Sequence, residues 1–399
     1  MKIGFDVSQT GSGKAGCGFF ADSLIRQLTA SDETNEYLLY PTFGGHFWDP
    51  DWKISTFNVN RPRVRRVEGY ATHGESRKFW LNPDDDFEEK LGFPDIVHSM
   101  NFFCPPDDKR FRIAYMLYDL CFIRHPDWTT EENRLGCFDG VFRASLYADF
   151  IITISEYSRT HFLRTFPYFP DERIKNVGGA SRLSIQEDLP RPDRLRNLKQ
   201  GGFWLVVGTL EPRKNHIRLL SAFLKLKKEQ GSLLPIVVAG GKGWLDEEIR
   251  NGLASVELEK ELFTLGYVDE DELHWLYQNC FAFVFPSLFE GLGLPVLEAM
   301  SCGAPVLTSE CSSLTELAGD SAILVDPYEE ESILKGLRTL LLDSVQRGSL
   351  AARGLRRSRE FTWENIAEKV RGIYEEMLIL PRRKFATKKE RPVHKEIII

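Results

Sequence analysis

Two glutamates, Glu290 and Glu298, stand eight positions apart in the segment EGLGLPVLE, with a Gly-Leu-Gly-Leu-Pro turn between them. Ionised carboxylates accept several hydrogen bonds, so a pair of them around a tight apolar turn could face a polar ligand. Gly291 and Gly293 allow a close backbone approach, and Pro295 suits the first turn of a helix. We therefore expect Glu290 in a loop and Glu298 in a first helical turn, both facing a ligand. The helix dipole alone is the alternative explanation for Glu298.

Two cations, Arg213 and Lys214, lie in the turn GTLEPRKN at residues 208–215, between an apolar run and a helical pattern. Arginine offers a planar fork of donors, lysine a point charge, and a helix start free amides, all of which suit a phosphate. A pair of solvated surface cations is the alternative. Ligands of parallel sheets lie beyond the carboxyl ends of the strands, and this position favours the phosphate interpretation.

The elements that would position these residues are short apolar runs separated by helix-like segments, a pattern typical of βαβ units and a parallel sheet. The pattern predicts strands at residues 2–7, 37–40, 54–59, 96–98, 113–117 and 150–154, and at 203–207, 236–239, 262–265, 282–285, 305–308 and 322–325. A chain of 399 residues is too long for one ordinary core. We therefore expect an α/β protein of two doubly wound, Rossmann-like domains.

The polar stretch at 181–202 contains two prolines and a glycine pair, and it reads as a linker between the domains. The predicted organisation is an N-terminal Rossmann-like domain at 1–180, the linker at 181–202, a C-terminal Rossmann-like domain at 203–361, an amphipathic helix at 362–380 that crosses back to the first domain, and a basic tail at 381–399. Two such domains would face each other across a cleft that holds the ligand.

Composition excludes several classes of protein. A net charge of −7 argues against a nucleic-acid-binding surface over the whole molecule. Seven scattered cysteines, without metal-ligand spacing, indicate reduced thiols. The N-terminus lacks an apolar signal core, and no apolar run approaches the ~18 residues of a spanning helix. We expect a cytoplasmic protein.

Two basic segments, RPRVRR at 61–66 and the tail at 381–399, stand out locally. Solvated surface is the first interpretation. Peripheral contact with an anionic membrane at its inner face is the second, since each clustered cation gains about 1 kcal/mol there.

The turn GTLEPRKN, followed further along by EGLGLPVLEAMSCGAPVLTSECSSLTELAGDSAILVDP, resembles the large retaining glycosyltransferase family 4, which has the GT-B fold. The order and spacing of these motifs are specific, and they cover most of residues 200–330. In the first half, ADFIITISEYSRTHF at 148–162 and AGCGFFADSLIRQL at 15–28 are similar to family segments. Members similar to this chain include bacterial mannosyltransferases of polysaccharide biosynthesis.

The resemblance implies a nucleotide-sugar donor held mainly by the second domain. Arg213 and Lys214 would neutralise the diphosphate and stabilise it as the leaving group. Glu290 would contact the donor sugar, and Glu298 would accept hydrogen bonds from the ribose hydroxyls. The backbone amides that would help to hold sugar and phosphate belong to Gly291, Leu292 and Gly293.

In the first domain, the resemblance implies that Gly16 and Gly18 allow an approach to the diphosphate. One departure from the family pattern is the pair Tyr118-Asp119, where members usually have His-Asp near the donor sugar. Three consequences stay open: the phenol makes an equivalent hydrogen bond, the donor differs, or activity is reduced.

We therefore expect a retaining hexosyltransferase (EC 2.4) that acts on a glycan or lipid-linked acceptor, needs no metal or other cofactor, and uses GDP-mannose or, second, a UDP-hexose. Two rivals remain. A dinucleotide-dependent oxidoreductase would use GSGKAG at 11–16, with Asp32 or Glu33 as the ribose-binding acid. A non-catalytic protein would bind the nucleotide sugar without transferring it.

Overall fold

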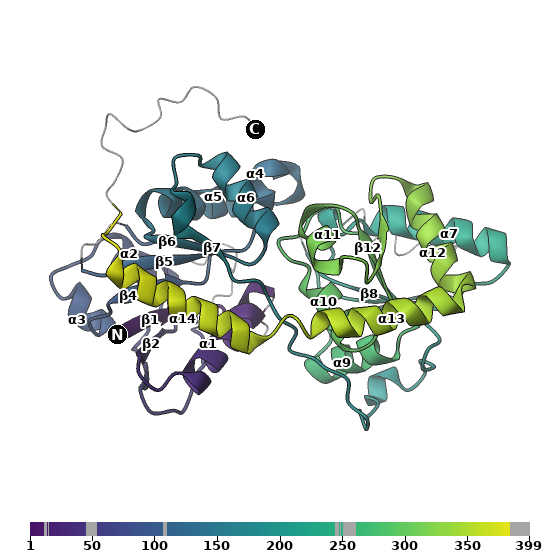
Figure 1. Ribbon diagram of the computed structural model, residues 1–399, viewed down its shortest axis with the longest axis horizontal. Helices are drawn as coiled ribbons and strands as arrows, with labels where there is room; N and C mark the ends of the chain where they lie inside the picture. The colour runs from purple at the N-terminus through teal and green to yellow at the C-terminus, as the bar shows by residue number, and fades with distance from the viewer. Residues whose placement is uncertain are drawn as a thin grey trace. The chain divides into compact units, whose positions relative to one another are not determined.

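The computed structural model describes residues 1–11, 14, 16–44, 54–106, 110–243, 247, 249 and 261–383. The chain forms two α/β units, each built on a parallel sheet flanked by helices (Figure 1). Unit 1 contains Met1–Pro126, Glu131–Gly179 and the chain from Trp363 onward, and unit 2 contains Asp127–Thr130 and Ala180–Thr362.

The sheet of unit 1 has the strand order β3-β2-β1-β4-β5-β6-β7, and every pair in it is parallel. Its order reverses between β1 and β4, because the chain continues from β1 through β2 to β3 on one side and resumes with β4 on the other, so ligands are expected beyond this point. The strands are β1 (Lys2–Asp6), β2 (Glu36–Tyr40), β3 (Val64–Arg66), β4 (Ile96–Ser99), β5 (Arg112–Leu117), β6 (Phe150–Thr153) and β7 (Ile174–Asn176). The helices are α1 (Gly16–Ser31), α2 (His73–Leu81), α3 (Phe87–Leu91), α4 (Cys121–Arg124), α5 (Glu131–Tyr147), α6 (Glu156–Thr165) and α14 (Trp363–Ile379).

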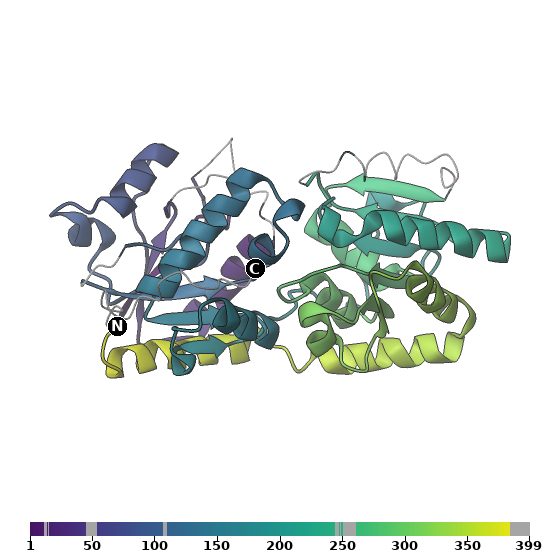
Figure 2. The same cartoon turned by 90° about the horizontal axis from the view of Figure 1, so that it is seen from above.

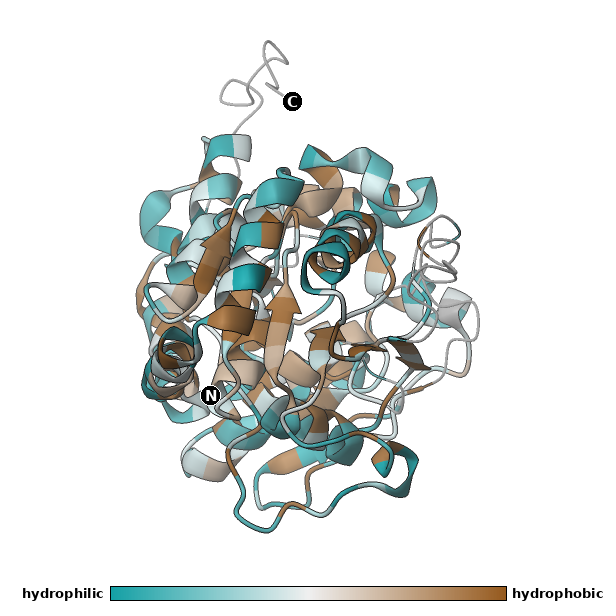
Figure 3. Ribbon diagram, turned by 90° about the vertical axis from the view of Figure 1, so that its right-hand side faces the viewer, coloured by the Kyte–Doolittle hydropathy of each residue, from teal (hydrophilic) through white to brown (hydrophobic). Residues whose placement is uncertain are grey.

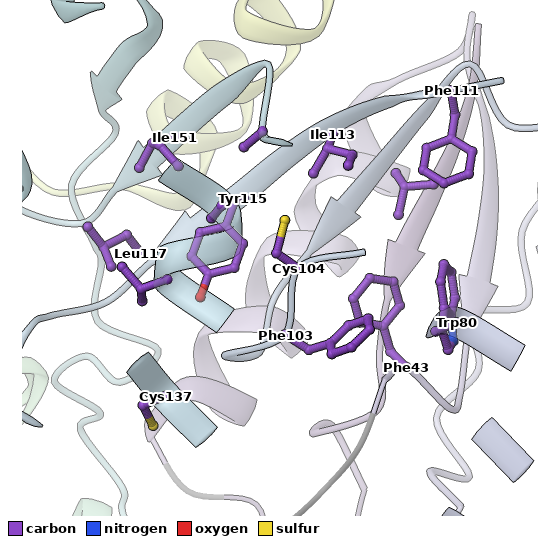
Figure 4. Close-up of a cluster of buried hydrophobic side chains, with 14 of the residues drawn as sticks. Phe43, Trp80, Phe103, Cys104, Phe111, Ile113, Tyr115, Leu117, Cys137 and Ile151 are labelled. Carbon is purple, nitrogen blue, oxygen red and sulfur yellow. The ribbon is translucent and has the colours of Figure 1, made fainter. Parts of the chain in front are cut away.

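An aromatic cluster fills the core on one face of this sheet (Figure 4). The rings of Phe43 and Trp80 lie 4.3 Å apart, and the ring of Phe103 meets that of Phe43 edge to face at 5.6 Å. Such pairs add about 0.5–1.5 kcal/mol to the free energy of burying the rings. The aromatic residues therefore hold the loops after β2 and β4 close to the sheet.

Helix α14 packs on unit 1 beside α1 (Figures 1 and 2). Nδ1 of buried His98, on β4, lies 2.6 Å from the hydroxyl of Tyr374 on α14. Beyond the helix, Arg383 donates to the backbone oxygens of Ser145 and Ala148, at 2.5 and 3.1 Å. Arg383 thus anchors the chain to the end of α5, so this part of the predicted basic tail is structural. Residues 384–399 of the tail lie outside the described residues.

The sheet of unit 2 has the order β10-β9-β8-β11-β12-β13, again with parallel pairs. Figure 3 shows hydrophobic strands enclosed by helices whose outer faces are hydrophilic. The strands are β8 (Trp204–Val207), β9 (Ile236–Ala239), β10 (Leu262–Gly266), β11 (Ala282–Phe285), β12 (Val306–Ser309) and β13 (Ile323–Val325). Its helices include α7 (His216–Gln230), α9 (Glu270–Asn279), α10 (Leu294–Ser301), α11 (Ser312–Ala318), α12 (Glu330–Leu342) and α13 (Ser344–Ser358).

The strand predicted at 54–59 is wrong, since no regular element forms there, and the third strand of unit 1 is β3 instead. The backbone oxygens of Ser55 and Phe57 accept hydrogen bonds from the guanidinium of Arg66, at 2.5 and 2.7 Å, rather than from a neighbouring strand. Arg66 belongs to the basic segment 61–66, which therefore serves the fold at this position.

The stretch at 181–202, interpreted as a linker from its composition, belongs to unit 2. Its side chains and backbone contact α9 through several hydrogen bonds, beginning with Arg182. Arg182, Ser184 and Gln186 pair with α9, whereas many other polar residues of the stretch are exposed, a distinction that composition does not make.

Candidate functional site

The loops after β8 and β11 lie next to each other in unit 2, because these strands pair where the strand order reverses. The backbone oxygen of Arg213, in the first loop, accepts hydrogen bonds from Leu288 N at 2.7 Å and from Ser287 Oγ at 2.9 Å. The two sequence motifs thus meet at the position where doubly wound sheets bind ligands.

The first loop is shaped by a short 3₁₀ turn, Pro212–Lys214, and by Asn215 in the left-handed region at φ 62°. The Asn215 amide donates to the backbone oxygens of Pro286 and Pro327, at 3.0 and 2.7 Å. Asparagine tolerates this backbone conformation better than most residues do. The turn therefore points Arg213 and Lys214 toward the second loop.

Glu290 is the centre of a compact charge cluster. Its Oε2 lies 2.8 Å from Arg213 Nη1, and its Oε1 lies 2.6 Å from Lys214 Nζ. The Ser287 hydroxyl donates to Oε1, also at 2.6 Å. Oε2 of Glu211, a residue of the first motif, lies 2.7 Å from Arg213 Nε. The cluster therefore contains two cations and two carboxylates, all fixed by short contacts.

The electrostatics keep Glu290 ionised. Burial alone would raise the pKa of this carboxyl, but Arg213 and Lys214 outweigh burial and lower the pKa to about 2. Burial and the nearby Arg213 lower the pKa of Lys214, against the opposing effect of Glu290. An ionised carboxylate of this kind accepts hydrogen bonds but does not donate a proton at neutral pH.

The backbone of Glu290 is held by the start of α11. Its N–H donates to Ser312 Oγ at 3.1 Å, and its carbonyl oxygen accepts from Ser313 Oγ at 2.8 Å. These contacts fix the peptide on both sides of the carboxylate. The geometry therefore positions the functional group from its backbone as well as from its partners.

Glu298 does not join this cluster. Its Oε1 lies 3.0 Å from Nε of Arg182, and its Oε2 accepts from the Tyr277 hydroxyl at 3.2 Å. Burial raises the pKa of Glu298, and the contacts with Arg182 and Tyr277 oppose that rise. Helix α10 begins at Leu294, so Glu298 is beyond the predicted first turn. The effect of the helix dipole falls off within the first turn, so the dipole does not explain the presence of a glutamate at position 298.

The turn between the glutamates depends on Gly293, which has φ 96° and precedes α10. A Cβ at this position would lie 2.5 Å from Leu314 Cδ2, so a larger residue would clash as well as strain the backbone. Leu292 is buried, and Gly291 is part of the same turn. Glycine thus permits the close packing of this loop against α11.

The predicted first-domain residues lie near the reversal point of the other sheet. Gly18 is required by packing, since a Cβ there would lie 2.1 Å from the Gln9 carbonyl oxygen, whereas Gly16 has open space. Buried Tyr118 donates its hydroxyl proton to the Met100 oxygen at 2.9 Å, with the Cys17 oxygen at 3.3 Å. Asp119 Oδ1 accepts from the Cys121 amide at 2.9 Å.

The rival dinucleotide motif is poorly supported. Three of its six positions, 12, 13 and 15, lie outside the described residues, and Lys14 pairs with Asp22. Asp32 accepts hydrogen bonds from Asn35, Thr34 and Tyr37 in the loop before β2. That loop is at the amino end of the strand, whereas cofactors of such sheets bind at the carboxyl ends.

Sequence reasoning missed several residues of the site. Glu211 and Ser287 stand inside or beside the quoted motifs, so the motifs could have indicated them. Arg182 and Tyr277 lie far from Glu298 along the chain, and no spacing pattern connects them. Tyr277 comes from α9 and Arg182 from the segment that contacts α9, and the packing of α9 against α10 brings both to Glu298.

Two features of the described part of the chain bear on ions and membranes. Its residues include no group of three His, Cys, Asp or Glu side chains that could hold a metal ion. Within the same residues, no helix is both long and apolar enough to cross a bilayer.

Comparisons with known proteins match this geometry. Residues 192–357 match the family model described as glycosyl transferases group 1. The chain is 30% identical over 387 residues to O-antigen chain mannosyltransferase B of Escherichia coli, covering 92% of this chain and 97% of that protein.

Solved structures of similar fold include sucrose-phosphate synthase from Thermosynechococcus elongatus, with a TM-score of 0.70, 18% identity, and coverage of 95% of this chain and 99% of that one. Anabaena Alr3699/HepE in complex with UDP and glucose has a TM-score of 0.69 and 17% identity, and the match covers 94% and 100% of the two chains. The fold is therefore GT-B, with two Rossmann-like domains.

Proposed function

Because the chain belongs to the group 1 glycosyltransferases, we propose that it moves a hexose from a nucleoside diphosphate to a glycan or lipid-linked acceptor, with retention of the anomeric configuration. The observation that carries this proposal is the Arg213, Lys214 and Glu290 cluster at the reversal point of the second sheet. The described residues hold no comparable feature in favour of the oxidoreductase, and the transfer assay below separates the non-catalytic binder from the enzyme.

The two cations act on the leaving group. Cleavage of the bond between sugar and diphosphate increases the negative charge on the phosphate oxygens, so fixed positive charge stabilises the transition state more than the ground state. Lysine has three donors and arginine five, which allows both to contact phosphate while they keep Glu290. We propose that they replace a divalent metal in this role.

Glu290 acts on the donor sugar. Its lowered pKa makes it a hydrogen-bond acceptor for sugar hydroxyls and not a general acid. Its negative charge also stabilises the positive charge that develops at the anomeric carbon. The contacts with Ser312 and Ser313 keep the carboxylate in place without reorganisation during the reaction.

The remaining residues hold the donor. Glu298 accepts hydrogen bonds from the ribose hydroxyls, and the backbone amides of Gly291, Leu292 and Gly293 bind sugar and phosphate. From the first domain, Gly16 and Gly18 allow approach to the diphosphate, and Tyr118 with Asp119 shapes the sugar side. Because the proton of Tyr118 is donated to Met100, the phenol serves this site as an acceptor or as backbone support.

GDP-mannose is the first candidate donor, since the similar E. coli protein is named a mannosyltransferase. A UDP-hexose is the second, because the Anabaena protein of similar fold was solved with UDP-glucose. A cytoplasmic location, with peripheral contact with an anionic membrane, is also part of the proposal. Of the basic segments, Arg66 and Arg383 bind backbone oxygens, so such contact would fall to other cations.

A thermal-shift screen of GDP-mannose, UDP-hexoses and nicotinamide dinucleotides identifies the donor, and a transfer assay then uses it. We expect Glu290→Gln and Lys214→Met each to lower the transfer rate at least 100-fold, a typical cost of removing transition-state charge. The matched control is Lys225→Met, which removes an exposed lysine paired with Glu330. Near-normal rates in both site variants, or stabilisation by nicotinamide dinucleotides alone, would contradict the proposal. Donor binding without transfer or donor hydrolysis would favour the non-catalytic rival.

A further inference from the structure

The first residues of the 181–202 stretch run along one face of α9. Arg182 Nη1 contacts Glu270 Oε2 at 2.6 Å, and His274 Nε2 lies 2.7 Å from the Ser184 oxygen. Gln186 and Gln278 then exchange two hydrogen bonds, of 2.9 and 2.7 Å. The contacts advance two residues along the segment for every four along the helix.

The register follows the helix. Positions 270, 274 and 278 share one face of α9 and lie about 6.0 Å apart along its axis. Residues 182, 184 and 186 each contact that face. The segment therefore contacts α9 at three successive points, and Arg182, the first of them, also contacts Glu298 on α10.

At that end, Arg182 connects an exposed acid to a buried one. Its side chain is 15% exposed, Glu270 is 59% exposed, and Glu298 is 9% exposed. The guanidinium uses separate nitrogens, Nη1 for Glu270 and Nε for Glu298, and its planar shape fixes the angle between them. Tyr277, also from α9, holds the other oxygen of Glu298.

We propose that Arg182 is a positioning residue, which orients and keeps ionised the carboxylate of Glu298 for the vicinal ribose hydroxyls of the donor nucleotide. The inference rests on the proposed function, because it takes Glu298 as the ribose acceptor. Each carboxylate oxygen has two acceptor positions. Arg182 and Tyr277 take one on each oxygen, which leaves one on each oxygen for a diol.

The electrostatics of the pocket support this role. Burial raises the pKa of Glu298, and Arg182 is the main group that opposes the rise. Without the guanidinium, the pKa would rise further. A protonated carboxyl has lost acceptor capacity, so ribose binding in an Arg182 variant would weaken as the pH falls toward the raised pKa.

The test measures the affinity of purified full-length protein for GDP and UDP by calorimetry, and for the 2′,3′-dideoxy form of the nucleotide that binds. We expect Arg182→Met to weaken binding of the parent nucleotide about tenfold and to leave binding of the dideoxy form within twofold. The variant should also show a steeper loss of affinity as the pH is lowered from 8 to 6. Glu270→Gln is the matched control, since it removes the outer partner and leaves Glu298 and Arg182 in contact, and its affinity should stay within about twofold.

Equal loss for both nucleotide forms, or unchanged affinity for both, would overturn the inference alone. Failure of the unmodified protein to bind either GDP or UDP would overturn the proposed function and the inference with it. Should Arg182→Met not fold, Arg182→Lys provides the same comparison. Lysine keeps the positive charge but lacks the planar guanidinium. The affinity for the parent nucleotide should therefore fall, while the affinity for the dideoxy form should not change. A variant that binds the parent nucleotide as tightly as the unmodified protein does would contradict the role.

Discussion

The ammonium group of Lys214 lies 2.6 Å from the carboxylate of Glu290, and each side chain is only 8% exposed. A buried ion pair is weak support for stability as a whole, but the loss of one partner leaves an uncompensated charge. The pair therefore contributes both to the stability of unit 2 and to the chemistry of the site. Variants of the two residues can separate the effect on stability from the effect on transfer.

We expect Lys214→Met to lower the free energy of unfolding by about 3–5 kcal/mol, because Glu290 would then lose one of its two cations. The double variant Lys214→Met, Glu290→Gln should recover much of that stability and remain inactive in transfer. Denaturant titration with the transfer assay measures both quantities. A double variant as unstable as the single one would show that the loss comes from packing and not from charge.

A second prediction concerns the two glycines at the start of α1. Gly18→Ala should destabilise unit 1 by more than about 2 kcal/mol, because the added Cβ would lie 2.1 Å from the Gln9 oxygen. Gly16→Ala should be neutral or stabilising by up to about 1 kcal/mol, since its Cβ would meet open space. If Gly16 approaches the diphosphate, Gly16→Ala will still reduce transfer. Thermal unfolding and donor KM distinguish these effects.

A third prediction tests the role of Tyr118. Tyr118→Phe removes the hydrogen bond to the buried Met100 oxygen. Because that acceptor loses the phenol as a donor, the free energy of unfolding should fall by about 1–3 kcal/mol. If the hydroxyl only supports this backbone, kcat should fall less than tenfold once the protein is folded. A loss of 100-fold or more, with KM unchanged, would instead assign the phenol to the transition state.

A fourth prediction concerns pH and His98. Burial lowers the pKa of this histidine to about 3, below its ordinary value of 6.5. The unfolded chain therefore takes up the proton first, so the stability contribution is complete above pH 6.5 and is lost as the pH falls toward 3. Between pH 7 and 5 we expect a loss of about 2 kcal/mol from this group.

His98→Gln is the variant that checks the fourth prediction, because glutamine can still contact Tyr374 but does not titrate. The difference in pH slope between the two proteins, measured by denaturant titration, isolates His98 from other groups. Asp6, for example, has its pKa raised to about 6 by burial, and its effect has the opposite sign. Identical slopes would mean that His98 is accessible to protons in the folded protein.

The sequence predicted much of the fold because apolar runs alternate with helical patterns at nearly every element. Its failure at 54–59 has a local cause: Arg66 binds the carbonyl oxygens that a strand would have offered to a neighbour. The motifs also predicted that Arg213, Lys214 and Glu290 belong to one site, as they follow strands that pair in the sheet. Arg182 and Tyr277 could not be predicted, since their meeting with Glu298 depends on how α9 packs.

Helix α14 adds a constraint on the order of events during synthesis. Tyr374 on α14 meets His98 across 276 positions of the chain, so unit 1 is complete only after α14 has left the ribosome. Unit 2 is almost continuous in sequence and can finish earlier, although its residues are translated later than most of unit 1. Premature termination or proteolysis before Trp363 would therefore damage the half of the molecule that was made first.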